Sequence, residues 1–197
     1  ENRSPNLDGL GLDAAGVALS GDAIAVDEQL ASNVAGIYAA GDIAGEPRLA
    51  HVAATQGWVA AENALGKSSS IDYAAVPRCI YGVSEIAAVG LSEEAAAAAG
   101  HAVRVGKFPF AANGLATISG ERGGIVKVVS ESDYGQILGV HIIGPHASEL
   151  IGEAVLAMRL EATPREIAAA IHIHPALSET VMSAAGEVFG PDGLPGA

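Results

Sequence analysis

The segments Gly-Ile-Val-Lys-Val-Val (124–129) and Gln-Ile-Leu-Gly-Val-His-Ile-Ile (136–143) decide the fold of the second half of the chain. Both are apolar and rich in β-branched residues, and the polar residues 130–135 between them have the length of a hairpin turn. We therefore predict two strands joined by a tight connection. A further strand is predicted over residues 102–110, and strand-like pieces lie within residues 78–89.

Helices are predicted around this hairpin. Ser92 is suited to cap a helix that Gly100 terminates. Residues 148–160 place apolar side chains at helical spacing, and Thr-Pro-Arg-Glu (163–166) combines a capping box with proline at the first helical position. This mixture of strands and helices indicates the α+β class.

The first half of the chain shows a different pattern. Gly-Ile-Tyr-Ala-Ala-Gly-Asp (36–42) predicts a buried strand that delivers Asp42 at its carboxyl edge, where ligands collect in α/β sheets. Residues 49–65 are rich in alanine and free of proline, which predicts a helix. Its N-terminus, near Ala50 and His51, would point unpaired N–H groups and a positive dipole end at an electron-rich ligand.

The Ser-rich connector over residues 67–77 is the best candidate for a domain boundary. It divides the chain into a first domain over residues 1–75 and a second over residues 76–190. Residues 191–197 form a tail rich in proline and glycine, which we expect to be disordered.

Composition excludes several classes of function. The 197 residues carry a net charge of −13, which argues against binding to nucleic acid or to an anionic membrane surface. Cys79 is the only cysteine, so the chain has no internal disulfide and no cysteine-rich metal site, and we interpret its thiol as structural. No stretch of 18 apolar residues occurs. We expect a soluble, cytoplasmic chain, and its abrupt start without methionine suggests a fragment of a longer polypeptide.

The strongest chemical signal is His-Ile-His-Pro-Ala-Leu-Ser-Glu (172–179). Pro175 favours an extended backbone at His174 and suits the first position of a helix, so Glu179 would lie just past the first helical turn. From there its carboxylate could fold back on the His174 imidazole, fix the tautomer and favour the charged form. A histidine held in this way is a candidate general acid/base.

Two other interpretations of this segment compete. A histidine that precedes a proline and a helix is commonly a capping or packing residue. His172 and His174 would also share one face of a strand, as metal ligands can. However, no Cys, Asp or further His lies at a short ligand spacing nearby, and zinc normally takes three or four protein ligands. We therefore predict no metal site and interpret His172 as structural.

Five motifs follow one another in a characteristic order: Arg-Ser-Pro-Asn (3–6), Ile-Tyr-Ala-Ala-Gly-Asp (37–42), Leu-Ala-His (49–51), Phe-Pro-Phe-Ala-Ala-Asn (108–113) and the segment 172–179. In this order they resemble the C-terminal part of the dihydrolipoamide dehydrogenases, a branch of the flavin-dependent pyridine nucleotide-disulfide oxidoreductases. The resemblance covers nearly the whole chain apart from the tail. It implies an α+β dimerisation domain with an antiparallel sheet and helices, preceded by the last piece of an FAD-binding α/β domain.

The resemblance implies cofactor-binding roles in the first domain. Asp42 corresponds to the family's aspartate that hydrogen-bonds the ribityl chain of the flavin. Arg48, Leu49, Ala50 and His51 occupy the segment that passes beside the isoalloxazine ring. For Arg48 and Leu49 the position of the backbone is expected to matter rather than the side chain.

The resemblance implies a catalytic role for His174 and Glu179. They correspond to the family's acid/base pair, in which the histidine takes a proton from a dihydrolipoyl thiol and electrons pass through FAD to NAD. In the family this pair serves the active site of the other subunit. The implied partners are therefore a second copy of the chain and the lipoyl domain of a 2-oxoacid dehydrogenase or glycine cleavage complex.

The chain also departs from the family pattern. The redox-active Cys-X4-Cys pair is absent because Cys79 is alone, and no Gly-X-Gly-X-X-Gly motif occurs. We therefore do not expect the chain by itself to turn over lipoamide. A related glutathione- or mycothiol-type disulfide reductase is an alternative, although Ala-Leu-Ser-Glu (176–179) resembles the lipoamide branch better. A non-catalytic dimerisation module is a second alternative, which an upstream Cys-X4-Cys pair in the full gene would exclude.

Overall fold

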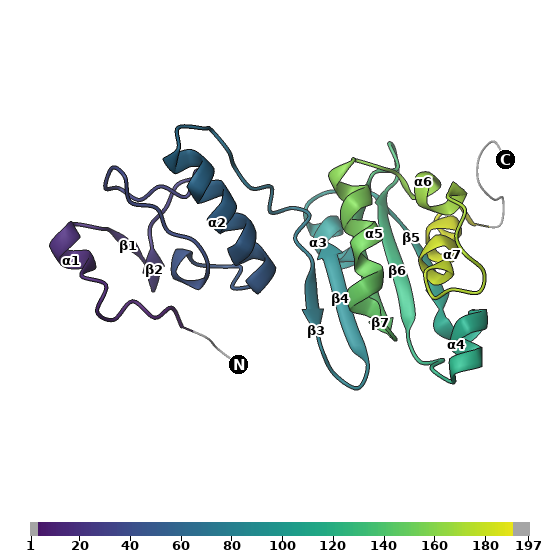
Figure 1. Cartoon of the computed structure of the whole chain (residues 1–197). Coiled ribbons are helices and arrows are strands. Elements are labelled where there is room, and N and C mark those ends of the chain that lie inside the picture. Colours follow the sequence, from purple (N-terminus) through teal and green to yellow (C-terminus); the bar gives the residue numbers. More distant parts are fainter. Residues whose placement is uncertain (1–3, 191–197) are drawn as a thin grey trace. The chain divides into compact units, whose positions relative to one another are not determined.

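The computed structural model describes residues 4–190 (Figure 1). The chain consists of two compact units, unit 1 up to Tyr73 and unit 2 from Ala74 onward. The division falls inside the Ser-rich connector, which forms no helix or strand between Gly66 and Pro77. The prediction of a disordered tail concerns residues 191–197, which lie outside the described residues.

Unit 2 is built on a five-stranded sheet of spatial order β3-β4-β7-β6-β5 in which all neighbouring strands are antiparallel. Its strands are β3 (Arg78–Ile80), β4 (Glu85–Gly90), β5 (Val103–Pro109), β6 (Ile125–Glu131) and β7 (Ile137–Gly144). The predicted hairpin over residues 124–143 is confirmed as β6 and β7, of which β7 is the central strand of the sheet. The predicted strand over residues 102–110 is confirmed as β5.

Helices cover one face of this sheet. Helix α5 packs on β4 and β7, α7 packs on β5 and β6, and α6 packs on α7 (Figure 1). The helices of unit 2 are α3 (Glu93–Ala98), α4 (Gly114–Ser119), α5 (Ala147–Arg159), α6 (Pro164–Ala169) and α7 (Glu179–Glu187). The core between sheet and helices contains fully buried Val128, Val140, Ile142, Ala154 and Val181. This α+β architecture confirms the predicted fold class.

Local sequence signals explain most helix starts in unit 2. The Ser92 side chain accepts the Ala95 N–H at the start of α3. At the start of α6, Thr163 and Glu166 form the predicted capping box with Pro164 at the first helical position. Such caps satisfy backbone N–H groups that the helix itself leaves unpaired, and each contributes about 1 kcal/mol.

Gly106 on β5 determines how closely α7 can approach the sheet. A Cβ atom at this position would come within 2.0 Å of the Ala184 carbonyl oxygen and 2.7 Å of the Val188 amide nitrogen. Only glycine therefore allows the α7 backbone to rest on β5 at this distance. This close packing holds the C-terminal half of α7 against the sheet.

The described part of unit 1, residues 4–73, contains little regular structure apart from one long helix. Its elements are α1 (Leu12–Ala15), β1 (Leu19–Ser20), β2 (Ala23–Ile24), the 3₁₀ helix η1 (Asp42–Ala44) and α2 (Ala50–Ala64). The predicted helix over residues 49–65 is confirmed as α2, and Gly66 follows it in the left-handed conformation with φ 85°. A small cluster of Val17, Ile24 and Ala39 forms the buried centre of this unit.

The predicted buried strand over residues 36–42 is wrong for this structure. Tyr38 pairs with Ala31 through one isolated antiparallel bridge, and Asp42 opens η1. A buried parallel strand needs hydrogen-bonding neighbours along its length. Within residues 4–190 this segment forms a β-bridge at only one position, Tyr38. The apolar run therefore does not become part of a sheet.

Candidate acid/base site

His174 and Glu179 lie side by side at the N-terminus of α7, as the sequence predicted. The His174 Nδ1 atom is 2.8 Å from Glu179 Oε1. The imidazole side chain is 78% exposed and the carboxylate 20% exposed. With Nδ1–H donating to the carboxylate, the Nε2 atom carries a lone pair. The arrangement can therefore accept a proton at Nε2 and stabilise the resulting imidazolium.

Glu179 is held in place by more than the histidine. Its second carboxylate oxygen, Oε2, accepts the Ala176 N–H at 2.8 Å. This backbone hydrogen bond is the main cause that lowers the pKa of Glu179, and the hydrogen bond from His174 adds to it. The carboxylate thus stays ionised beside the imidazole near neutral pH.

The start of α7 differs from the prediction. Pro175 does not occupy the first helical position, because it lies in a bend, residues 177 and 178 form a turn, and the helix begins at Glu179 with Ser178 as its N-cap. The reason is the hydrogen bond between the Ala176 N–H and the Glu179 side chain, which closes a turn ahead of the helix. Glu179 therefore reaches His174 from the first residue of the helix rather than from beyond its first turn.

Asn113 is a residue of this site that sequence reasoning did not assign. Its buried side chain donates from Nδ2 to the Ala176 carbonyl at 2.9 Å, and its Oδ1 accepts the Ala116 N–H at 3.0 Å. It therefore caps α4 and ties that helix to the turn after His174. A Cβ atom on the neighbouring Gly114 would lie 3.9 Å from His174 Cε1, which places the start of α4 beside the imidazole.

His172 makes a second histidine–carboxylate pair close to the first. Its Nε2 atom is 2.9 Å from Glu153 Oε1 on α5, and its Nδ1 atom is 2.9 Å from the Ala170 carbonyl oxygen. The His172 side chain is only 9% exposed. The spacing of 19 residues between Glu153 and His172 gave no signal in the sequence, since nothing local connects them.

The predicted cofactor residues of unit 1 lie around the N-terminus of α2. Asp42 is half-buried at the start of η1, and its carboxylate accepts no hydrogen bond from the described part of the chain. Gly41 approaches α2 closely, since a Cβ atom there would lie 3.3 Å from Ala53 Cβ, and its N–H donates to Gln56 Oε1 at 2.7 Å. These contacts hold the Asp42 backbone against the helix.

The N-terminus of α2 carries no side-chain cap. Leu49 occupies the N-cap position in an extended conformation, and Ala50 and His51 begin the helix with exposed side chains. A leucine cannot accept the first N–H groups of a helix. The structure thus keeps Leu49, Ala50 and His51 together at a helix end whose dipole favours negative charge.

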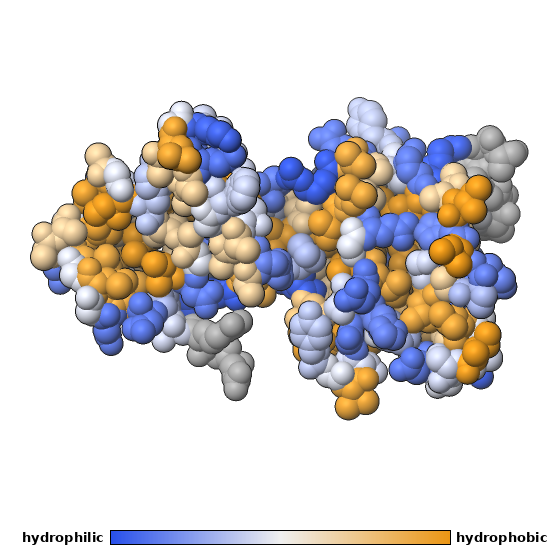
Figure 2. Space-filling model, in the orientation of Figure 1, coloured by the Kyte–Doolittle hydropathy of each residue, from blue (hydrophilic) through white to orange (hydrophobic). Residues whose placement is uncertain are grey.

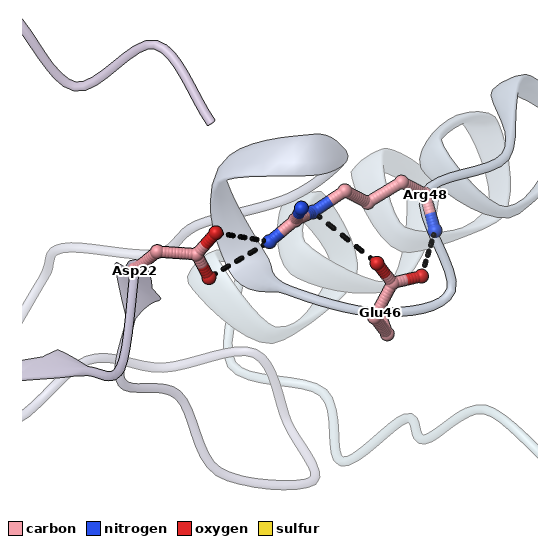
Figure 3. A network of polar contacts seen from close by, with 3 residues as sticks. All are labelled: Asp22, Glu46 and Arg48. Atoms are coloured by element: carbon pink, nitrogen blue, oxygen red, sulfur yellow. Dashed lines mark hydrogen bonds and ion pairs between the residues drawn. The ribbon is translucent and has the colours of Figure 1, made fainter. Parts of the chain in front are cut away.

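Arg48 has a clear structural partner. Its Nη2 atom lies 2.8 and 2.7 Å from the two carboxylate oxygens of Asp22 in the β1–β2 turn, and its Nε atom is 3.6 Å from Glu46 Oε1 (Figure 3). The Glu46 carboxylate also accepts the Arg48 N–H. The side chain therefore fixes the loop that leads into α2, which is consistent with a role for backbone position in this segment.

The structure shows neither a metal centre nor a membrane span in residues 4–190. No three His, Cys, Asp or Glu side chains gather there as ligands for one ion. In the same residues, no helix combines the length and the hydrophobicity needed to cross a bilayer. Cys79 is half-buried against the core of unit 2, and this burial raises the pKa of its thiol.

Comparison with known protein families identifies the chain. Residues 76–185 match the model of the pyridine nucleotide-disulphide oxidoreductase dimerisation domain. The chain belongs to this family. Residues 3–57 match a second model, described as pyridine nucleotide-disulphide oxidoreductase. The resemblance inferred from the five ordered motifs is confirmed.

Similar proteins within the pyridine nucleotide-disulphide oxidoreductases are dihydrolipoyl dehydrogenases. The enzyme of Bacillus subtilis is 45% identical over 93% of this chain, and that of Thermus scotoductus is 46% identical over 93%. The crystal structure of LpdA from Mycobacterium tuberculosis superposes with a TM-score of 0.86 at 36% identity over 92% of the chain. The chain spans 39%, 40% and 40% of these three proteins, respectively.

Proposed function

We propose that this chain is the C-terminal part of an FAD- and NAD-dependent dihydrolipoamide dehydrogenase. In this proposal it contributes the acid/base pair and the dimer interface to the oxidation of dihydrolipoyl groups in the cytoplasm. The main support for this proposal is the His174–Glu179 pair. Its 2.8 Å hydrogen bond uses Nδ1 and leaves the Nε2 atom of an exposed imidazole able to accept a proton. The similarity to dihydrolipoyl dehydrogenases along 93% of the chain supports the choice of substrate.

The proton step follows from the geometry of the pair. A dithiol with an ordinary thiol pKa is mostly protonated at neutral pH, and only the thiolate attacks a disulfide. His174 would accept the thiol proton at Nε2, while Glu179 stabilises the charge that develops on the ring. The thiolate would then attack the redox disulfide that the family carries outside this chain, and a cysteine thiolate would leave.

The residues of unit 1 fit one wall of a flavin site. The Asp42 carboxylate has hydrogen-bonding capacity that residues 4–190 do not use, and the uncapped start of α2 at Leu49, Ala50 and His51 favours a ring with negative charge. Arg48 would act by fixing the backbone ahead of the helix. FAD supplies electron transfer from the dithiol to NAD when it is bound.

A homodimer would place this acid/base pair at the active site of a second copy. Large apolar side chains reach the surface of unit 2 at Leu156, Leu160, Ile171 and Ile173. Figure 2 shows hydrophobic surface over the end of α5. An exposed apolar surface of this kind is typical of a protein interface. We expect the chain at micromolar concentration to scatter light with twice its monomer mass of 19.6 kDa, and a monomer mass would contradict the dimer.

The same proposal includes a lipoyl domain as the macromolecular substrate. Such a domain belongs to a 2-oxoacid dehydrogenase or glycine cleavage complex and would bring its dithiol to the exposed imidazole. Nucleic acid is an unsuitable partner, because the net charge of −13 would repel its phosphate groups.

The test is the His174→Gln variant of the full-length enzyme, with its FAD bound. Glutamine has no basic nitrogen, so turnover of dihydrolipoamide should fall by about two to four orders of magnitude. NADH-dependent reduction of ferricyanide needs no proton transfer from a dithiol and should be unchanged. Unchanged turnover of dihydrolipoamide in this variant would contradict the catalytic assignment.

A further inference from the structure

Residues 171–175, here called the strap, carry His174 between α6 and α7. None of these residues makes a backbone–backbone hydrogen bond within the described chain. The side chains of Ile171 and Ile173 point outward and are almost fully exposed. Within one copy of the chain, the strap is therefore positioned by side-chain contacts at its two ends rather than by a ladder of backbone hydrogen bonds.

The C-terminal side of the strap is anchored by the contacts of the site itself. Asn113 donates to the Ala176 carbonyl, and the Glu179 carboxylate accepts the Ala176 N–H. On the N-terminal side the corresponding anchor is His172, which reaches Glu153 on α5 at 2.9 Å. Without that contact, one side of the strap would lose its side-chain attachment to the helical layer.

The hydrogen bonds of His172 hold both nitrogens of its ring. The Nδ1 atom faces the Ala170 carbonyl oxygen and the Nε2 atom faces a Glu153 carboxylate oxygen, each at 2.9 Å. A neutral imidazole has one N–H and can donate to one of these oxygen atoms, whereas an imidazolium can donate to both. Contacts on both sides of the ring restrict it to one orientation.

We propose that Glu153 and His172 form a positioning pair that fixes the strap so that the His174 imidazole remains on Glu179 with Nε2 turned toward the substrate. This inference rests on the proposed acid/base function of His174. The pair touches no reacting atom and acts through the backbone of residues 172–174. Misplacement of a catalytic group by about 1 Å can cost about 10²-fold in rate. Loss of the Glu153–His172 contact should therefore have a measurable effect on turnover.

The experiment uses the full-length enzyme with FAD bound and compares Glu153→Gln with Glu149→Gln. Glu149 lies one turn earlier on α5, is exposed, and makes no side-chain hydrogen bond to the described residues. Glu153→Gln should lower kcat for dihydrolipoamide about 10- to 100-fold with KM little changed. NADH-dependent ferricyanide reduction should stay the same in both variants, and Glu149→Gln should behave as the parent enzyme.

A double variant separates positioning from a general loss of structure. Because the pair acts through His174, adding Glu153→Gln to His174→Gln should cause little further loss of kcat. The proposal is overturned if the two losses multiply, or if ferricyanide reduction falls together with dihydrolipoamide turnover. His172→Gln serves as the second variant and should reproduce the effect of Glu153→Gln.

The outcomes also distinguish this proposal from the proposed function. If His174→Gln is slow while Glu153→Gln and His172→Gln turn over as fast as the parent enzyme, the positioning pair is wrong and the acid/base assignment stands. If His174→Gln itself retains full turnover, the proposed function fails, and the positioning pair fails with it.

Discussion

The two units of the chain differ in how many of their backbone N–H and C=O groups are paired in strands and in how large a buried core they form. Unit 2 has a five-stranded sheet with antiparallel partners along each internal strand and a core of buried residues on both layers. Within residues 4–73, unit 1 has two strands of two residues each, one isolated bridge and a small buried cluster. Stability from burial and from hydrogen bonding is therefore concentrated in unit 2.

This difference explains why the two candidate sites are defined to different degrees. The hydrogen bonds of the His174 site join Asn113 at the start of α4, Ala176 and Glu179 of α7, and all of them lie within unit 2. In unit 1, by contrast, the Asp42 carboxylate accepts no hydrogen bond from residues 4–190, and α2 begins without a side-chain cap. The geometry of the proton-transfer site can thus be tested by substitutions of residues in this chain.

Hydrogen exchange should show the largest contrast between the units. Amides in the centre of β6 and β7 exchange only on global opening, which protects them by about 10³- to 10⁸-fold in typical domains. The Ala31 and Tyr38 bridge of unit 1 should exchange far faster, because its opening breaks few contacts. Mass spectrometry of the exchanged chain measures both, and equal protection in the two units would show that stability is not concentrated in unit 2.

A smaller effect is expected from Asn113→Ala, which removes the link between α4 and the turn after His174. The variant loses the N-cap of α4 and leaves the carbonyl of half-buried Ala176 without its donor. We expect unfolding of unit 2 to require about 1–3 kcal/mol less free energy. Denaturant titration measures this loss, with the exposed Ser119→Ala on the same helix as a control. A stability equal to that of the parent chain would show that the link contributes nothing.

The smallest effect is the acid sensitivity of unit 2. Hydrogen bonds from the backbone and side chain of Ser148 lower the pKa of Glu85, and the Thr163 hydroxyl lowers that of Glu166. Because the unfolded chain keeps the ordinary value near 4.5, it binds more protons than the folded chain below that pH. The stability from these groups is present above about pH 4.5 and is lost as pH falls through the folded values.

Denaturant midpoints measured at pH 7 and at pH 3.5 check this expectation. The parent chain should lose more stability on acidification than Glu85→Gln, which has no carboxylate to protonate at that position. An equal loss in the two proteins would show that the Ser148 contact does not contribute to the pH dependence.

Sequence reasoning succeeded where the determining contacts are local. The hairpin of β6 and β7 follows from two β-branched segments around a polar turn, and α6 follows from the Thr163–Glu166 capping box. The pairing of His174 with Glu179 also spans only five residues. In each case the residues that set the geometry are close enough in the chain to be recognised as a pattern.

Sequence reasoning failed where distant residues decide the outcome. Asn113 lies 63 residues from Ala176, and Glu153 lies 19 residues from His172, so neither contact leaves a periodic signal. The start of α7 was misplaced because the rule for proline at the first helical position does not anticipate the Glu179 carboxylate accepting the Ala176 N–H. The segment 36–42 has the composition of a strand but lacks a strand beside it.

The role of His174 is tested most directly by the rate at which dihydrolipoamide reduces the bound flavin in the full-length enzyme. Rapid mixing in the absence of NAD isolates this half of the reaction. We predict that His174→Gln slows flavin reduction by dihydrolipoamide by about 10²- to 10⁴-fold, while reduction of the same flavin by NADH keeps the parent rate. Equal rates of reduction by dihydrolipoamide in the two enzymes would contradict the role of His174 as the proton acceptor.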